Sequence, residues 1–580
     1  MRPAPVNVRS VVLALALSAC AAHPAGVSPI PAGPESGVAP TWGYAGKARV
    51  ADGAHGMVVS GSPIASDVGR SILEKGGNAI DAATAVGFAL AVVHPEAGNI
   101  GGGGFSIIRT ADGKVTALDY RETAPAAATK SMYLDLRGDP TDLSINGILS
   151  VGVPGSVAGL VEQHRKYGRL PLGDVMAPAI ALARDGFTVD DYRARSIDGE
   201  RPRLYLFAGS RAEYLPDGHA PLAGTVFRQP DLARTLQMIA DSGADGFYAG
   251  PVSDLIVTEM ERDGGIITHA DLTAYRAIWR DPIAIEYRGY TVYSMPPSSS
   301  GGVTLAEILN VMEGFGTLPP FGSPQLIHRE AEAMRRAFTD RNFYLGDPAF
   351  VDAPIAKLIS KAYADSLRAT IDLQHATPSA DVKPAAGGTS TTHYSVVDAE
   401  GNAVSTTTTL NNSFGSGVTV SGAGFLLNDE MDDFASAPGK PNMYGLVQGE
   451  VNAVAPGHRM LSAMTPSVVT DPAGQLFLVV GTPGGPTIIT QVYHVISNVI
   501  DHHMSLPDAV AAPRMHHQGL PDEIRLEAGG FYPATIAALR AMGHAIAFRS
   551  RWGDVEAIIR TPGGWEGVSD PRLGGGGAGY

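Results

Sequence analysis

The sequence predicts a large protein of mixed α+β architecture. Helix patterns occupy residues 64–75 and 79–93, and strand patterns dominate from Thr391 onwards. The chain has 580 residues, more than one core usually organises, so either two lobes or one large sandwich is expected. Its composition, 44% apolar and 17% charged, supplies ample material for such a core.

The charge and cysteine content exclude several classes of function. A net charge of −15 argues against a nucleic-acid partner, since no basic surface could release the counterions of a phosphate backbone. The same charge argues against a polybasic membrane surface. The single cysteine excludes an intramolecular disulfide and a thiolate metal cluster.

Residues 1–20 read as an export signal, with Arg2 and Arg9 before a short apolar run. The run ends in Leu-Ser-Ala-Cys20, which resembles the lipobox of bacterial lipoproteins, where the cysteine is lipidated. We therefore expect an exported, periplasmic protein anchored by lipid to the outer membrane. An ordinary signal peptide is the alternative. Residues 21–45, rich in Pro, Ala, Gly and Ser, are expected to form a flexible linker.

Regular structure is expected from about Val58. The first helix, 64–75, ends at two glycines, and Asn78 can cap the second, 79–93. The second helix has apolar residues on nearly every side, so we expect it to be buried between layers.

Further strands and helices are expected beyond these two helices. Strands are predicted at 106–109 and 115–120, and helices alternate with loops over 150–375. A further strand is predicted at 287–293.

A hairpin pattern surrounds Thr391. Residues 391–397 and 403–410 alternate like strands and flank a five-residue loop. If Val397 pairs with Ala403, Thr409 lies opposite Thr391, and Asn411 lies two residues further on the same face. This register predicts a second hydroxyl and an amide beside Thr391.

Thr391 is a candidate nucleophile if the chain is cut in front of it. The cut would give this residue a free α-amine, which can act as the base for its own hydroxyl. Such an amine titrates near ~8, so much of it accepts a proton around neutral pH. The loose segment 381–388 before it suits a region that opens after cleavage.

Several separated motifs resemble those of the γ-glutamyltransferases, also called glutathione hydrolases. They are Gly98-Asn-Ile-Gly-Gly-Gly-Gly-Phe105, Ser294-Met-Pro-Pro297, Thr391-Thr-His-Tyr-Ser-Val-Val-Asp398, Leu426-Leu-Asn-Asp-Glu-Met-Asp-Asp-Phe434 and Gly481-Thr-Pro-Gly-Gly485. The resemblance implies an N-terminal-nucleophile hydrolase fold, an αββα sandwich. It also implies self-cleavage between Ser390 and Thr391 into a large subunit, 46–390, and a small subunit, 391–580.

The resemblance also implies how the substrate head group is held. Arg121 matches the arginine that binds the α-carboxylate, for which a forked guanidinium is well suited. Glu430 and Asp433 match the acidic pair that grips the α-ammonium. Ser462 matches one of two adjacent carboxylate-binding serines, but its neighbour here is Ala463, so one hydroxyl donor is missing.

The remaining matches concern the reacting bond and the lid. Thr409 and Asn411 match residues that orient the nucleophile and the substrate amine. Gly484 and Gly485 match the oxyanion hole, where two backbone N–H groups meet the developing charge. Tyr444 matches the aromatic residue of a lid loop.

The predicted function is the cleavage of γ-glutamyl bonds in glutathione and related compounds, through a γ-glutamyl ester on Thr391. Water or an amino acid or peptide then accepts the acyl group, and no metal or organic cofactor is implied. A cephalosporin (glutaryl) acylase and an uncleaved lipoprotein that only binds γ-glutamyl peptides are the alternatives. The acidic pair favours a glutamyl donor, because a glutaryl group has no ammonium to bind.

Overall fold

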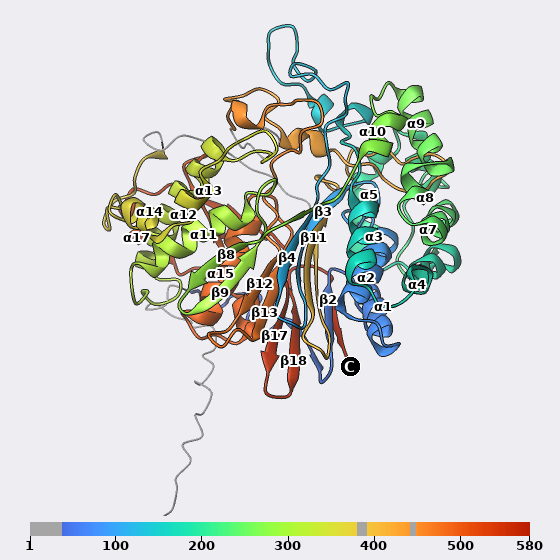
Figure 1. The fold of residues 1–580 in the computed structure, drawn as a ribbon. Coiled ribbons are helices and arrows are strands. Elements are labelled where there is room, and N and C mark those ends of the chain that lie inside the picture. The colour runs from blue at the N-terminus through green and yellow to red at the C-terminus, as the bar shows by residue number, and fades with distance from the viewer. Residues whose placement is uncertain (1–37, 380–390, 441–447) are drawn as a thin grey trace, which may run out of the picture.

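Two seven-stranded sheets form the centre of the computed structural model, which describes residues 38–379, 391–440 and 448–580 (Figure 1). The first sheet has the strand order β19 (Gly576–Gly579), β2 (Met57–Ser60), β10 (Thr392–Val397), β11 (Ala403–Thr409), β3 (Gly103–Arg109), β4 (Val115–Tyr120), β7 (Ile278–Arg280). The second has the order β1 (Arg49–Gly53), β18 (Gly564–Ser569), β17 (Glu556–Thr561), β13 (Leu476–Gly481), β12 (Ser467–Thr470), β9 (Tyr290–Ser294), β8 (Ile283–Tyr287).

Helices cover the outer face of each sheet (Figure 1). The first sheet is covered by α1 (Pro63–Glu74), α2 (Ala79–Val93) and α3 (Ser156–Tyr167), and the second by α11 (Gly301–Glu313) and α15 (Thr487–Ile500), while α12 (Pro324–Tyr344) packs on α11. The inner faces of the two sheets pack on each other, with β10 against β13 and β17. The molecule is therefore the predicted α+β sandwich of the αββα type.

Shorter elements surround this core. The helices are α4 (Leu172–Asp185), α5 (Asp191–Leu204), α6 (Ala208–Tyr214), α7 (Pro230–Ser242), α8 (Asp245–Tyr248), α9 (Pro251–Asp263), α10 (His269–Ala274), α13 (Ile355–Leu358), α14 (Lys361–Arg368), α16 (Leu506–Ala511) and α17 (Pro533–Ala541). Two small sheets join β5 (Phe187–Thr188) to β6 (Val226–Phe227), and β14 (Met515–His516) to β15 (Ile524–Glu527) and β16 (Ile546–Arg549).

The two early helices agree with their sequence signals. The side chain of Asn78 caps α2 by accepting hydrogen bonds from two backbone N–H groups, and Asp81 completes a capping box. All fifteen residues of α2 are buried, because the helix lies between the first sheet and α4. No helix among the described residues is long and apolar enough to cross a membrane.

Three expectations need correction. The segment 287–293 is a hairpin rather than one strand, because Arg288 and Gly289 both have positive φ and form a two-residue turn between β8 and β9. Regular structure begins before Val58, at β1. The described end of the predicted linker belongs to the folded domain, since Trp42 is buried and its Nε1 donates to the carbonyl of Ala511 at 2.8 Å.

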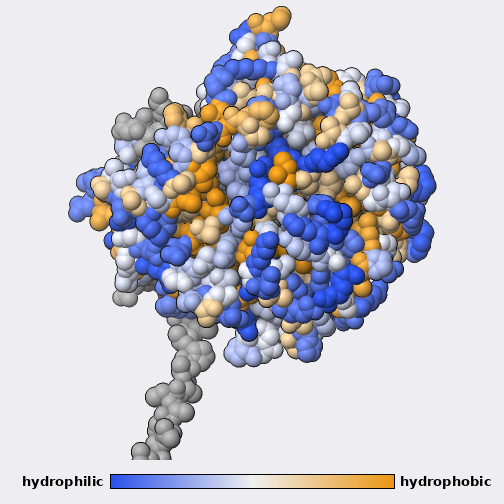
Figure 2. All heavy atoms as spheres, in the orientation of Figure 1, coloured by the Kyte–Doolittle hydropathy of each residue, from blue (hydrophilic) through white to orange (hydrophobic). Residues whose placement is uncertain are grey.

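The surface is a mosaic of hydrophilic and apolar side chains (Figure 2). Leu136, Leu222, Leu206 and Phe343 are the most exposed of the large apolar residues described. Leu136, Leu206 and Leu222 lie in connecting segments, and Phe343 lies in α12.

Candidate active site

One pocket collects most of the predicted site residues. It is lined by Arg121, Thr391, Thr409, Asn411, Glu430, Asp433, Ser462 and Gly485. Thr409 is the last residue of β11 in the first sheet, and the other residues lie outside the strands of the two sheets. Arg121 precedes Ser390 in the chain, and the others follow it. The space they enclose is small, about 20 Å³, which is room for a single water molecule.

The predicted hairpin register is confirmed. Val397 pairs with Ala403 and Thr392 with Thr408, so Thr391 and Thr409 face each other at the open end of β10 and β11. The two side-chain oxygens are 3.4 Å apart. The Thr409 hydroxyl is thus in position to orient the hydroxyl of Thr391.

Asn411 reaches the same pocket by a different route from the one expected. Strand β11 ends at Thr409, and Asn411 has a φ of 76°, a left-handed conformation that asparagine tolerates. Its N–H donates to Thr409 Oγ1 at 2.8 Å, and its Nδ2 donates to the carbonyl of Asp429 at 3.0 Å. A tight turn, and not strand alternation, therefore places this amide.

Arg121 forms ion pairs with both members of the predicted acidic pair. It follows β4, while Glu430 and Asp433 lie in the short 3₁₀ helix η4 (Glu430–Asp433). Burial raises the pKa of Glu430 and of Asp433, and the charge of Arg121 opposes that rise. Burial lowers the pKa of Arg121, but the charges of its carboxylate neighbours outweigh this effect, and the pKa is raised overall.

The backbone and side chain of Arg121 are held by a buried network that the sequence did not reveal. Its N–H donates to Asp119 Oδ1 at 3.0 Å, and its Nε donates to the carbonyl of Met460 at 3.1 Å. Its carbonyl accepts from the hydroxyl of Tyr275 at 2.8 Å and from the guanidinium of Arg459. The orientation of the guanidinium is thereby fixed by residues that precede the predicted cleavage point in the sequence and by residues that follow it.

The predicted oxyanion loop joins β13 to α15. Gly484 and Gly485 have φ values of 139° and 55°, a conformation that favours glycine. Among the described residues, neither of their N–H groups donates a hydrogen bond. Helix α15 begins at Thr487, so the positive end of its dipole also lies at this loop.

Ser462 and Ala463 form another wall of the pocket. Ser462 Oγ accepts from the N–H of Met464 at 3.1 Å, and the carbonyl of Ser462 accepts from Ser300 Oγ at 2.6 Å. Ala463 presents a methyl group to the pocket, so the second hydroxyl donor is missing there, as the sequence indicates. Three predicted residues, Cys20, Ser390 and Tyr444, lie outside the described residues.

Arg341, which was not predicted, also lines the pocket. It lies near the end of α12 and is 1% exposed. No motif distinguishes it in the sequence, because its place in the pocket depends on how α12 packs in the folded molecule.

His393, two residues after Thr391, and the pair His328 and His544 are buried and hydrogen-bonded to other side chains. His393 is buried between Thr407 and Ser395, and burial lowers its pKa to about 3. Among the described residues, one set of potential metal ligands lies close together: His328, Glu332 and His544. His328 Nδ1 and His544 Nε2 are hydrogen-bonded to each other at 2.8 Å, and Glu332 is paired with Arg335 and Arg336.

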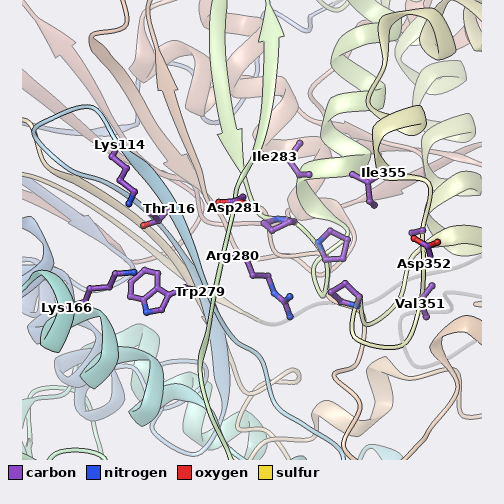
Figure 3. Close-up of a pocket in the computed structure, with 15 residues that line it drawn as sticks. Lys114, Thr116, Lys166, Trp279, Arg280, Asp281, Ile283, Val351, Asp352 and Ile355 are labelled. Carbon is purple, nitrogen blue, oxygen red and sulfur yellow. The ribbon is translucent and has the colours of Figure 1, made fainter.

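A separate hollow of about 660 Å³ is lined by Lys166, Trp279 and Arg280, among other residues (Figure 3). Lys166 Nζ is 3.5 Å from the ring centre of Trp279, and Arg280 lies beside them. Arg280 Nε donates to Asp119 Oδ2 at 2.7 Å, so this hollow touches the network that holds Arg121. Of the predicted site residues that the structure describes, none lines it.

Comparison with known proteins gives consistent results. The profile of the family described as Gamma-glutamyltranspeptidase matches residues 65–580. The chain is 47% identical over 525 residues to the glutathione hydrolase proenzyme of Escherichia coli (strain K12), covering 89% of this chain and 90% of that protein.

Solved structures agree with this result. The crystal structure of a cephalosporin acylase from Bacillus halodurans superposes with a TM-score of 0.82 at 29% identity, covering 93% of this chain and 99% of that one. A γ-glutamyltranspeptidase structure from Helicobacter pylori has a TM-score of 0.54 at 47% identity, covering 56% of this chain and 93% of that one.

Proposed function

This chain belongs to the gamma-glutamyltranspeptidase family, and we propose that it is a self-processed γ-glutamyltransferase and glutathione hydrolase. One observation supports this most strongly: the Thr391 hydroxyl faces Thr409 in a pocket whose walls carry Arg121, Glu430 and Asp433. A nucleophile beside one cation and two carboxylates suits a donor that ends in a free amino acid, whose carboxylate and ammonium these groups can bind.

Maturation makes the nucleophile competent. The Thr391 hydroxyl oxygen attacks the carbonyl carbon of Ser390, and the peptide C–N bond breaks as an ester forms. Water hydrolyses the ester, leaving a carboxylate on Ser390 and a free α-amine on Thr391. The amine then takes the proton of the hydroxyl, as no other base is needed.

Catalysis repeats this chemistry on the substrate. The Thr391 hydroxyl oxygen attacks the γ-carbonyl carbon, and the oxyanion is met by the N–H groups of Gly484 and Gly485. The α-ammonium of Thr391 returns its proton to the leaving amine. Water, or the amine of an amino acid or peptide, then opens the γ-glutamyl ester.

Substrate binding exchanges one set of ion pairs for another. Arg121 is ion-paired with Glu430 and with Asp433 in this structure, and the three side chains leave little open space. A glutamyl head group carries an α-carboxylate and an α-ammonium. Its carboxylate can replace Glu430 and Asp433 as the partner of Arg121, while its ammonium pairs with these two acids. A donor with only one of the two charges would leave a buried partner unpaired, which is costly.

The acylase alternative has support from the Bacillus halodurans relative, but the acidic pair argues against it. A glutaryl group offers a carboxylate without an ammonium, so Glu430 and Asp433 would stay paired with Arg121 and compete with that carboxylate. We therefore expect kcat/KM for a γ-glutamyl anilide to exceed that for the glutaryl anilide by at least about 100-fold, which is about 3 kcal/mol. Comparable values for both donors would favour an acylase.

The cellular setting is also a proposal. We infer that the signal-like start exports the chain and that Cys20 carries a lipid, which places the enzyme in the periplasm on the outer membrane. The sequence Leu-Ser-Ala-Cys20 supports this. Intact mass spectrometry tests it, because a lipid on Cys20 adds mass to the large subunit, and Cys20→Ser should release soluble protein.

The decisive test of function follows both the cut and the turnover. The purified protein should give two bands on a denaturing gel and release aniline from a γ-glutamyl anilide. Thr391→Ala should remain one inactive band, while Thr391→Ser should retain some cleavage. Thr258→Ala, on the exposed face of α9, is the matched control and should behave as the wild type. Turnover by a chain that stays whole would instead identify a different mechanism, and an uncut, inactive wild type would identify a binding protein.

A further inference from the structure

We propose that Arg341 is a second binding residue for the α-carboxylate of the donor. This inference rests on the proposed function and assigns a further contact to the same pocket. Arg341 lies on α12, is 1% exposed, and lines the pocket together with Arg121, Ser462 and Ala463.

The hydrogen bonds of Arg341 leave its charge uncompensated. Its Nε donates to Ser300 Oγ at 3.0 Å and its Nη1 donates to Asn342 Oδ1 at 2.9 Å, and both acceptors are neutral. Among the residues that the structure describes, no carboxylate oxygen lies within 4.0 Å of its guanidinium nitrogens.

Other deeply buried arginines differ in this respect. Each described arginine that is at most 5% exposed has a carboxylate partner, apart from Arg341; these are Arg121, Arg193, Arg335, Arg459, Arg514 and Arg572. A buried cation without a counterion is strongly disfavoured unless something else supplies the negative charge. The fold therefore keeps an unpaired cation in the pocket where the substrate binds.

Burial lowers the pKa of Arg341 to about 10, with the nearby charge of Asp433 opposing this change. The group is still protonated at neutral pH, because its pKa remains well above 7. It can therefore attract an anion under the conditions in which the enzyme would work.

The charges in the pocket indicate which anion. Arg121 is already shared by Glu430 and Asp433, so these three groups alone carry an excess negative charge when both acids are ionised. Glu122 Oε2 also lies 3.7 Å from Arg121 Nη1, so Arg341 reduces an excess of negative charge, and cations beside carboxylates suit a zwitterion. The α-carboxylate is the anionic part of a glutamyl donor, and Ala463 offers it no hydroxyl on this wall.

Arg341 also has a structural contact, because its Nε donates to Ser300 Oγ. Ser300 links it to the small subunit, since Ser300 Oγ donates to the carbonyl of Ser462. Loss of Arg341 could then weaken binding by displacing Ser462. Such a displacement would weaken the binding of donors with and without an α-carboxylate, whereas loss of a direct contact would weaken only the binding of donors that carry it. Comparing the two kinds of donor therefore separates the two roles.

The experiment compares two donors in four proteins. The donors are a γ-glutamyl anilide and the same anilide with its α-carboxylate converted to a carboxamide, which keeps the ammonium. The proteins are the wild type, Arg341→Gln, Arg341→Lys and Ser300→Ala. Arg329→Gln, elsewhere on α12, serves as the matched control.

We expect Arg341→Gln to raise KM for the acid donor about 10- to 100-fold while kcat changes less than about threefold. On the carboxamide donor, kcat/KM should match that of the wild type within about threefold, and Arg341→Lys should recover part of the loss on the acid donor. Ser300→Ala should leave the ratio between the two donors close to that of the wild type.

Equal losses on both donors, or no loss on the acid donor, would overturn the inference. Two measurements distinguish loss of binding from misfolding: the cleaved fraction on a denaturing gel and the melting temperature of each variant. If the wild type itself does not turn over the acid donor, the proposed function fails instead. The two failures are thus distinguishable.

Discussion

The wall of the pocket at Ala463 shows how one missing oxygen can change substrate binding. Ser462 is 2% exposed and Ala463 8% exposed, and both line the space that a substrate carboxylate would enter. A hydroxyl at position 463 would add one donor to the carboxylate that we propose Arg121 and Arg341 bind. A hydrogen bond to a charged group contributes about 1.5–3 kcal/mol at best, and less where solvent competes.

We therefore expect Ala463→Ser to lower KM for a γ-glutamyl anilide by about three- to tenfold, with kcat nearly unchanged. The physical reason is uniform binding, since the carboxylate is held equally in the ground state and the transition state. Steady-state kinetics measures this. A carboxamide donor is the control, and an unchanged or higher KM on the acid donor would mean that the methyl group of Ala463 is needed for packing.

Local patterns predicted the nucleophile hairpin well, while tertiary packing decided what the sequence missed. The loop 398–402 and the alternation around it fixed the pairing of Val397 with Ala403, because such signals act over a few residues. The sequence pattern puts Arg288 and Gly289 inside one strand, since the strand-forming residues Tyr287 and Tyr290 on either side hide a two-residue turn. Arg341 carries no local signal, as its burial arises only from the packing of α12.

At the scale of elements, the contact between the two sheets fixes the position of the nucleophile strand. His393 on β10 points toward β13, where a Cβ on Gly481 would lie 2.2 Å from the nearest ring atom of His393. No side chain fits at position 481 unless β10 or the imidazole moves. The absence of a side chain there therefore supports the position of Thr391, two residues before His393.

Gly481→Ala should reduce self-cleavage and activity, each by at least about tenfold, because a small shift of the reacting atoms is costly. His393→Ser combined with Gly481→Ala should recover part of both, since the smaller side chain removes the clash. Gly563→Ala is the matched control, as a Cβ at that position meets open space. A cleavage rate for Gly481→Ala equal to that of the wild type would show that the sheets adjust freely. Time courses on denaturing gels measure the rates.

The contact between α12 and α15 makes a pH-dependent contribution to the free energy of unfolding. Glu330 on α12 is buried and accepts from the hydroxyl of Tyr493 at 3.2 Å, while His494 is 4.0 Å away. Burial raises the pKa of Glu330 to about 8, and the nearby charge of Asp501 contributes. Burial lowers the pKa of His494 to about 3, so that neighbour is neutral.

The sign of the effect follows from the two states of Glu330. Because its pKa is higher in the folded protein, the folded state keeps a proton that the unfolded chain releases above about 4.3. Its stabilising contribution is complete below that pH and is lost as the pH rises toward 8. We expect Glu330→Gln to melt near the wild type at pH 5 and several degrees higher at pH 8. Scanning calorimetry at both pH values measures this, and an equal difference at the two would contradict it.

At the scale of the whole molecule, the two predicted subunits are interleaved in both sheets. In the first sheet, β10 and β11 from the small subunit lie between β2 and β3 from the large one. In the second, β1 of the large subunit pairs with β18 of the small one, and β9 pairs with β12. Most of the hydrophobic core on either side of the sheets is built from both pieces.

Cleavage should therefore leave the particle intact. We expect the processed enzyme to elute from a sizing column as one species that contains both pieces, and to separate only under denaturing conditions. The small subunit produced alone should be insoluble, because β10 and β11 would expose both edges that β2 and β3 cover, and such edges promote aggregation. The matched control is the Thr391→Ala precursor, which should elute at the same volume because its strands are already in place. Arg121 lies in the large subunit, while Glu430 and Thr391 lie in the small one, so neither subunit alone holds the whole pocket. Separation of the two subunits in native buffer with activity retained in one of them would therefore contradict this prediction.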